Sequence, residues 1–391
     1  MTTDYRKQLL YLSALIMDMC VGIVLFAIPL FLIERLHASA FIIGLTGSLG
    51  ALGYSLFCLG TGRLSDKLGR KKVVTIGLGI FISAYFLIPF VRSLFPVFIL
   101  VILGGIGMSM FWPPLQAWVA ESTEKKRLIE SLGIFNISWS VGLMLGSLLG
   151  GILFPLGSGV PFYFAVGQTV VLLLIILQLS EVQKRPLPEE LKTADENILI
   201  DKTSFLFIAW MANFVSWFIV IMLRNLFPVL AVNLEISPRV LGVLIFLIYF
   251  SQTGMFILLR RFRGWHYRIG PLLFCQGLAS IGLIIGFFTS SILLFGISFI
   301  LMGVSGGMTY FSSIFYSLDS LSAKGKKTGF HESILGTGAL LGPLFGGLAA
   351  RYYNLRAPYL LGLILLICAM LLEVVIYHNA KTVNRRKRKN L

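Results

Sequence analysis

The sequence predicts an all-α integral membrane protein with twelve transmembrane helices in two similar halves. Of its 391 residues, 57% are hydrophobic and only 13% are charged, which is too little polarity to cover a soluble globule of this length. Twelve segments are long and apolar enough to cross a bilayer, and five glycines of the fifth segment recur in the eleventh. These observations together indicate a membrane-embedded helical bundle built from a duplicated unit.

Each expected helix is a stretch of roughly 20 or more mainly apolar residues, the length that crosses a hydrocarbon core about 30 Å thick. In chain order the segments lie near 9–34, 38–62, 73–92, 94–120, 128–155, 160–182, 204–233, 238–260, 268–289, 291–319, 328–353 and 357–378. The first is too long for the apolar region of a signal peptide and lacks a small-residue cleavage site, so we expect a retained helix. Each cysteine stands alone in an apolar segment, without the spacing typical of disulfides or metal sites, and we interpret all four as packing residues: Cys20, Cys58, Cys275 and Cys368.

The basic residues predict the orientation of the chain. The net charge is +16, but the cations alternate with apolar spans, and 27 of the 33 Lys and Arg residues fall on one side of the membrane. The positive-inside rule makes that side cytoplasmic and places both termini there. This distribution argues against a nucleic-acid partner, whereas the basic run 385–389 is a candidate for contact with anionic lipid. We expect a monomer in a prokaryotic inner membrane.

A long polar interval divides the helices six and six. We expect a first bundle over 1–183, a cytoplasmic linker over 184–203, a second bundle over 204–380 and a basic tail over 381–391. The repeated glycines, each displaced by 196 positions, are Gly133, Gly142, Gly146, Gly150 and Gly151 in the first half, and Gly329, Gly338, Gly342, Gly346 and Gly347 in the second. Glycine in membrane helices permits close packing, so we expect the two glycine-rich helices to approach their partners closely.

The loop between the second and third segments has a distinctive pattern. It reads Gly62-Arg63-Leu64-Ser65-Asp66-Lys67-Leu68-Gly69-Arg70-Lys71-Lys72, with five cations and one carboxylate that cannot lie in lipid. The run resembles the signature loop of major facilitator superfamily transporters, Gly-x-Leu-x-Asp-x-x-Gly-Arg-(Arg/Lys), at every fixed position. The resemblance implies two six-helix bundles that work by alternating access around a site near mid-membrane.

The same resemblance implies a conformational latch that closes the cytoplasmic side. In the family, the loop contacts the start of helix 11, expected here near Gly329, and its arginine pairs with an acid at the end of helix 4. The latch residues would be Gly62, Asp66, Gly69, Arg70 and Glu121. Gly62 would allow a close backbone approach, and the N-terminus of helix 11 would stabilise the Asp66 carboxylate. The simpler alternative is that the loop only fixes topology.

Within the superfamily, the pattern is most similar to that of the 12-helix drug:proton antiporters. The sequence Pro161-Phe162-Tyr163 after the fifth segment resembles this group. Two positions depart from its motifs, because Val101 stands where an arginine precedes Gly104, and Ser147 replaces the proline of the fifth-helix glycine motif.

Ionisable groups inside membrane helices are costly and therefore usually functional. Asp18 lies about 14 Å into the first helix at 1.5 Å per residue, so it is a candidate for proton coupling or for substrate contact. The alternative is a structural acid bonded to Ser or Asn. Glu332 and His331 stand where the first-half repeat has Asn136 and Phe135, and they are further candidates for gating or protonation. For Glu332 the alternative is a first-turn acid in water.

The resemblance also implies that helices 1, 4, 7 and 10 line the cavity. Its polar and aromatic candidates are Asp18, Trp112, Gln116, Asn213, Trp217, Tyr310, Ser313 and Tyr316. We expect Arg224 at the outer interface or outer mouth and Glu373 near the cytoplasmic interface, the latter without a function. The 32 Phe and six Trp residues favour an aromatic cavity for an amphipathic molecule over one for a polyhydroxylated sugar.

The sequence lacks the motifs of the common enzyme classes. It has no phosphate-binding loop and no His-Glu-x-x-His motif, so we expect no enzyme activity, no cofactor and no metal. We predict a secondary transporter that exports a small amphipathic molecule in exchange for protons. The alternatives are uniport or symport of a sugar, metabolite or lipid-like substrate. A non-transporting sensor or a membrane-embedded enzyme would need a signalling domain or a catalytic pair that the sequence does not offer.

Overall fold

The computed structural model describes residues 3–123, 128–180, 196–262, 264–318 and 324–389. Within these ranges the chain forms twelve α-helices and two short 3₁₀ turns, and no β-strand. The helices are α1 (Thr3–Leu36), α2 (Ala40–Leu68), α3 (Arg70–Leu87), α4 (Leu94–Glu121), α5 (Leu128–Leu153), α6 (Val160–Gln178), α7 (Glu196–Asn233), α8 (Pro238–Arg261), α9 (Ile269–Phe288), α10 (Ile292–Leu318), α11 (Lys324–Tyr352) and α12 (Ala357–Lys389). Each contains a stretch long and apolar enough to span a membrane. The predicted all-α class and the twelve predicted spans are confirmed.

Several helices are longer than the apolar segments that predict them. α7 begins at Glu196, so residues 196–203 of the expected linker are helical. The rest of the linker lies mostly in 181–195, outside the described residues. α12 continues to Lys389 and includes most of the expected tail. Hydropathy marks where a helix leaves the membrane, whereas a polar helix can continue into water.

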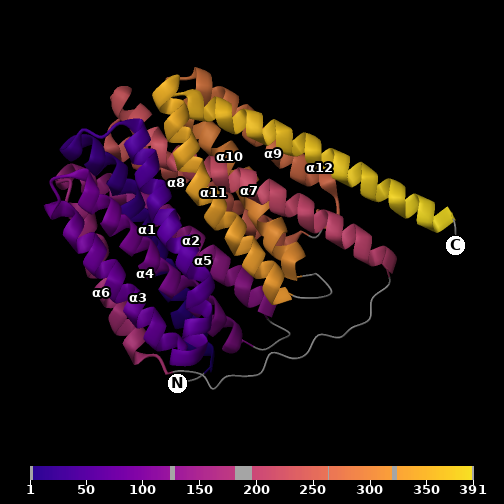
Figure 1. Cartoon of the computed structure of the whole chain (residues 1–391), viewed down its shortest axis with the longest axis horizontal. Coiled ribbons are helices and arrows are strands. Elements are labelled where there is room, and N and C mark those ends of the chain that lie inside the picture. Colours follow the sequence, from indigo (N-terminus) through magenta and orange to yellow (C-terminus); the bar gives the residue numbers. More distant parts are fainter. Residues whose placement is uncertain (1–2, 124–127, 181–195, 263, 319–323, 390–391) are drawn as a thin grey trace.

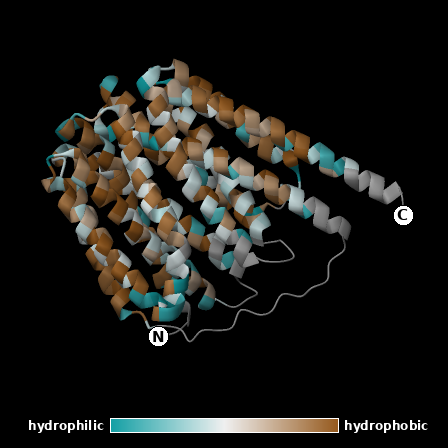
Figure 2. Cartoon of the chain, viewed as in Figure 1, coloured by the Kyte–Doolittle hydropathy of each residue, from teal (hydrophilic) through white to brown (hydrophobic). Residues whose placement is uncertain are grey.

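The ends of several helices follow from local sequence. Ser39 and Ser237 precede α2 and α8, and each hydroxyl oxygen accepts a hydrogen bond from the backbone N–H three residues later, over 3.4 Å. Between α2 and α3, Gly69 adopts a φ of +95°, which other residues rarely adopt. Hydrophobic residues dominate the helices and hydrophilic residues gather near their ends (Figure 2).

The helices pack as two bundles with the same internal arrangement. In the first bundle α1 packs against α5 and α6, and α4 packs against α2 and α3. In the second bundle α7 packs against α11 and α12, and α10 packs against α8 and α9. Contacts of α2 with α11 and of α5 with α8 join the bundles. Figure 1 shows α3 and α6 on one flank of the molecule and α9 and α12 on the opposite flank.

The repeated glycines lie at equivalent crossings in the two bundles. A Cβ atom on Gly146 would lie 2.3 Å from the Met19 carbonyl oxygen of α1, and one on Gly342 would lie 2.4 Å from the Phe218 carbonyl oxygen of α7. The last glycine of each set faces the other bundle. Gly151 lies against Gly242 of α8, and Gly347 lies against Gly44 of α2. Equivalent glycines therefore contact equivalent helices, as a duplicated unit requires.

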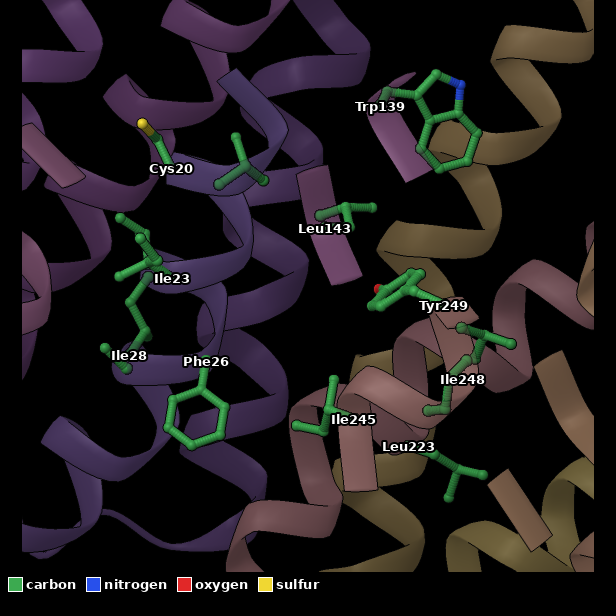
Figure 3. Packing of buried hydrophobic residues seen from close by; sticks show 14 of the residues in the cluster. Cys20, Ile23, Phe26, Ile28, Trp139, Leu143, Leu223, Ile245, Ile248 and Tyr249 are labelled. Carbon is green, nitrogen blue, oxygen red and sulfur yellow. The ribbon is translucent and has the colours of Figure 1, made fainter. Parts of the chain in front are cut away.

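A buried hydrophobic cluster extends through both bundles and across their junction. Figure 3 shows part of it, with Ile23 and Phe26 of α1 on one side and Ile245 and Tyr249 of α8 on the other. A second cluster lies within the second bundle; its members include Phe205, Trp210, Trp265 and Tyr316.

Candidate functional site

A cavity lies between the two bundles. The space open to the centres of water molecules is about 210 Å³. Helices α1, α2, α4 and α5 of the first bundle and α7, α10 and α11 of the second contribute most of its lining. Three charged side chains line it, which are Asp18, Arg224 and Glu332. The rest of the lining is mainly aliphatic and aromatic.

The structure separates the predicted cavity residues into two groups. Asp18, Trp112, Gln116, Trp217, Tyr310 and Glu332 line the cavity, whereas Asn213, Ser313, Tyr316 and His331 do not. On α10, Tyr310 faces the cavity, and residues three and six positions later are rotated from it by about 60° and 120°. Ser313 and Tyr316 consequently pack inside the second bundle.

The residues outside the lining have defined positions. The Ser313 hydroxyl and His331 Nδ1 are 2.7 Å apart and hydrogen-bonded, whereas His331 Nε2 is buried without a hydrogen-bond partner. The Tyr316 hydroxyl accepts a hydrogen bond from the Tyr267 backbone N–H at 2.9 Å. Asn213 is 1% exposed, and neither of its amide atoms has a hydrogen-bond partner.

Arg224, expected at the outer interface or the outer mouth, lines the cavity. Its Nη1 donates a hydrogen bond to the Tyr249 hydroxyl at 3.2 Å, and its Nε is buried without a partner. It lies close enough to Asp18, across the cavity on α1, for the two charges to interact. The sequence gives the depth of Arg224 along α7, but the direction of its side chain depends on how the helix is rotated. The seven-residue spacing from Trp217 places both side chains on one helix face, and this spacing could have predicted that Arg224 lines the cavity.

Glu332 connects the two bundles across the cavity. Gln116 Nε2 of α4 donates a hydrogen bond to Glu332 Oε1 of α11 at 3.3 Å. The expected alternative for Glu332, a first-turn acid in water, does not describe this position, because α11 begins at Lys324 and Glu332 lies beyond its second turn.

Three aromatic side chains gather beside these charges, and we call Trp139, Trp217 and Tyr310 the aromatic triad. Their ring centroids are 5.2 to 6.5 Å apart. Trp139 Nε1 donates to Asn136 Oδ1 at 3.1 Å, which fixes the indole. Such rings offer apolar area and electron-rich faces that attract cations. Trp139 was missed because α5 was not expected to line the cavity.

The signature loop forms a charged group that we call the Arg70 cluster, consisting of Asp66, Arg70 and Glu121. Arg70 Nη2 lies 2.6 Å from Asp66 Oδ1 and 2.8 Å from Glu121 Oε1. Its Nη1 donates to the Ser65 hydroxyl at 2.5 Å. The structure thus brings together Arg70 and the acid at the end of α4 to which the resemblance assigned it.

Two details of the expected latch differ from the structure. A Cβ atom on Gly62 would have no neighbour within 4 Å, so the close approach expected there is not present. The same is true of Gly329, which lies inside α11 because this helix begins earlier, at Lys324. Asp66 pairs with Arg70 of its own loop.

Glu373 and the four cysteines are not part of the cavity lining. Glu373, expected near an interface, is fully buried, and Gln276 Nε2 of α9 donates to its Oε1 at 2.8 Å. This burial is within the protein and leaves the predicted depth of Glu373 a prediction. Within the described ranges no group of His, Cys, Asp and Glu residues could hold a metal ion, and the four cysteines are free.

Two similar six-helix bundles that enclose a central cavity define a membrane transport protein. A model of the Major Facilitator Superfamily matches residues 10–324 and 206–390, and the chain belongs to this family of transporters. Multidrug resistance protein 1 of Bacillus subtilis is 28% identical over 208 residues, 53% of either chain. Quinolone resistance protein NorA of Staphylococcus aureus is 26% identical over 169 residues, 41% of this chain and 42% of NorA. The matched segments thus span about half the length of these relatives.

Solved structures show the same fold over the whole chain. A variant of the nucleoside transporter NupG has a TM-score of 0.75 at 13% identity, covering 95% of this chain and 99% of NupG. An inward-facing, unoccupied structure of a bacterial homologue of the human lysosomal transporter Spinster has a TM-score of 0.71 at 15% identity. The match covers 98% of this chain and 97% of that homologue.

Proposed function

We propose that the protein exports a small amphipathic molecule in exchange for protons. The observation that carries this proposal is the composition of the cavity, which combines an aromatic triad with two carboxylates and one guanidinium. An aromatic, largely apolar wall favours a molecule with a hydrophobic body, and a few charged groups orient it. The similarity to a multidrug resistance protein and to a quinolone resistance protein supports export of such compounds.

Asp18 is our candidate for the proton-coupling site. It is 6% exposed overall, lines the cavity and lies deep in α1. Intramembrane acids commonly mark proton pathways. Its interaction with Arg224 spans the two bundles, so the charge of Asp18 contributes to the attraction between them. Binding or release of a proton at Asp18 then changes the balance between two arrangements of the bundles. Glu332 and His331 are secondary candidates.

The junction between the bundles suits a rocking motion. The Ser48 hydroxyl of α2 donates to the Leu340 carbonyl oxygen of α11 at 2.7 Å, and the Ser140 and Thr253 hydroxyls of α5 and α8 are 2.7 Å apart. Small residues let the backbones of these helices approach closely. In this proposal the Arg70 cluster stabilises the state that is closed on the cytoplasmic side.

The orientation is part of the proposal. The excess of cations on one membrane face supports a cytoplasmic location for both termini and for the signature loop. We propose a prokaryotic inner membrane as the location, with anionic lipid near the basic tail.

Purified protein in liposomes with an imposed pH gradient tests this function. The panel should contain cationic and zwitterionic dyes, sugars and metabolites. We expect wild-type protein to move a dye against its gradient when protons flow the other way. The Asp18→Asn variant should bind the dye but no longer respond to the proton gradient. Glu34→Gln, an exposed acid on the same helix, is the matched control and should behave as wild type. Gradient-dependent transport by Asp18→Asn would exclude Asp18 as the coupling site.

A further inference from the structure

The proposed function assigns no role to Arg224, the guanidinium that lines the cavity. Among the described residues that line the cavity, Arg224 is the single cation. Neither a hydrogen bond nor an ion pair joins Arg224 to Asp18. Arg224 donates a hydrogen bond to the neutral Tyr249 hydroxyl, and its Nε–H is buried without an acceptor.

A guanidinium in this position favours a particular kind of ligand. Arginine carries five N–H donors in a planar fork that matches a carboxylate through two parallel hydrogen bonds. Without a ligand, donors that face a cavity are satisfied by water. A ligand that displaces this water without supplying an acceptor leaves a charged donor unpaired, and its binding is weakened. A ligand with an acidic group replaces the water with a stronger partner.

The other pole of the cavity has the opposite charge. On α7, Arg224 lies seven residues beyond Trp217, about 10 Å farther from the membrane face that carries the termini. Glu332 lies near the other end, since α11 starts at that face and the adjacent His331 ring is 5.1 Å from Tyr310. Trp217 of the aromatic triad lies on the same face of α7 as Arg224, and Tyr310 lies against His331, the neighbour of Glu332, so the triad lies beside both charged residues.

We propose that Arg224 binds an acidic group of the cargo, and that the preferred cargo is a zwitterionic aromatic molecule. Its acidic group pairs with Arg224, its ring lies against the aromatic triad, and its cationic group lies at Glu332. Asp18 is then free to carry the proton. This inference rests on the proposed function, because it names the class of molecule that the same cavity takes.

Equilibrium binding of a matched dye pair tests the inference. The probes are a rhodamine with a free benzoate and the methyl ester of the same dye, measured by fluorescence anisotropy with purified protein in nanodiscs. The strength of a hydrogen bond between charged groups corresponds to an affinity ratio of about tenfold or more. We therefore expect wild type to bind the acid at least about tenfold more tightly than the ester. Arg224→Gln should remove this preference by weakening the acid alone.

Further variants distinguish the effect of Glu332 from that of Arg224 and provide a control. Glu332→Gln should weaken the acid and the ester by a similar factor, because both dyes share the cation, and should keep their ratio. Arg239→Gln removes an exposed arginine outside the cavity lining and should match wild type. Should Arg224→Gln not fold, Arg224→Lys keeps the charge without the planar fork, and it should show a reduced preference for the acid.

Equal affinities of wild type for the two dyes, or an acid preference that survives in Arg224→Gln, would overturn the inference. Equal wild-type affinities would mean that Arg224 only balances the charge of Asp18. Because binding needs no proton gradient, the two proposals fail separately. A protein that prefers the acid but shows no gradient-driven transport in liposomes would refute proton-coupled export and leave the Arg224 site in place.

Discussion

Replacing Gly342 by alanine tests the role of the repeated glycines in the fold. The new Cβ atom would lie 2.4 Å from the Phe218 carbonyl oxygen and 3.2 Å from its carbonyl carbon, so the backbone of α7 or α11 must move. Overpacking of this kind costs about 1 to 3 kcal/mol. Alanine recovers up to about 1 kcal/mol of helix propensity over glycine. We therefore expect a net loss of up to about 2 kcal/mol in the free energy of unfolding, and a loss of about 1 to 3 kcal/mol relative to a glycine-to-alanine change that causes no clash.

The assay is unfolding of purified protein in mixed micelles, followed by helical circular dichroism as the fraction of SDS rises. Gly277→Ala is the matched control, because a Cβ atom at Gly277 of α9 would have no neighbour within 4 Å. That variant should be as stable as wild type or slightly more so. Gly146→Ala, at the equivalent position of the first bundle, should lose about as much as Gly342→Ala. If Gly342→Ala and Gly277→Ala were equally stable, the close crossing of α7 and α11 would be wrong.

The remaining predictions concern the Arg70 cluster and the aromatic triad. Asp66→Ala removes one of the two carboxylates that pair with Arg70 and should shift the equilibrium toward the state that is open to the cytoplasm. Alkylation of cysteines introduced on each membrane face measures this shift. Unchanged labelling on both faces would contradict the prediction. Trp139→Ala should weaken dye binding about 3- to 10-fold, from a loss of about 0.5 to 1.5 kcal/mol of ring interactions, while an exposed aromatic such as Phe288 changed to alanine serves as the control. Unchanged dye affinity in Trp139→Ala would remove the triad from the site.

Much of the fold could be predicted because the bilayer imposes a strong length requirement. Apolar segments of the necessary length gave all twelve spans, and the glycine spacing gave the duplication. Helix ends such as Glu196 and Lys389 could not be predicted, since no hydrophobic signal marks where a helix stops in water.

The cavity was harder to predict, because it depends on helix rotation as well as depth. Depth along α10 is similar for Tyr310 and Ser313, but only Tyr310 faces the cavity. The internal repeat also relates cavity-lining positions of α5 to those of α11. Trp139 is equivalent to Leu335, and Leu143 is equivalent to Ala339, and all four line the cavity. Extending the repeat to facing positions would have added α5 to the predicted lining.

At one pair of equivalent positions, the duplicated helices α5 and α11 carry different residues that make different hydrogen bonds. In α5, Asn136 holds the indole of Trp139, whereas in α11 its counterpart Glu332 reaches Gln116 across the cavity. Two identical bundles would present a cargo with the same chemistry from both sides, so a bound molecule would have two equivalent poses. Divergence at this position puts a fixed indole on α5 and a carboxylate on the equivalent part of α11, so a cargo bound as proposed above would have one preferred head-to-tail orientation.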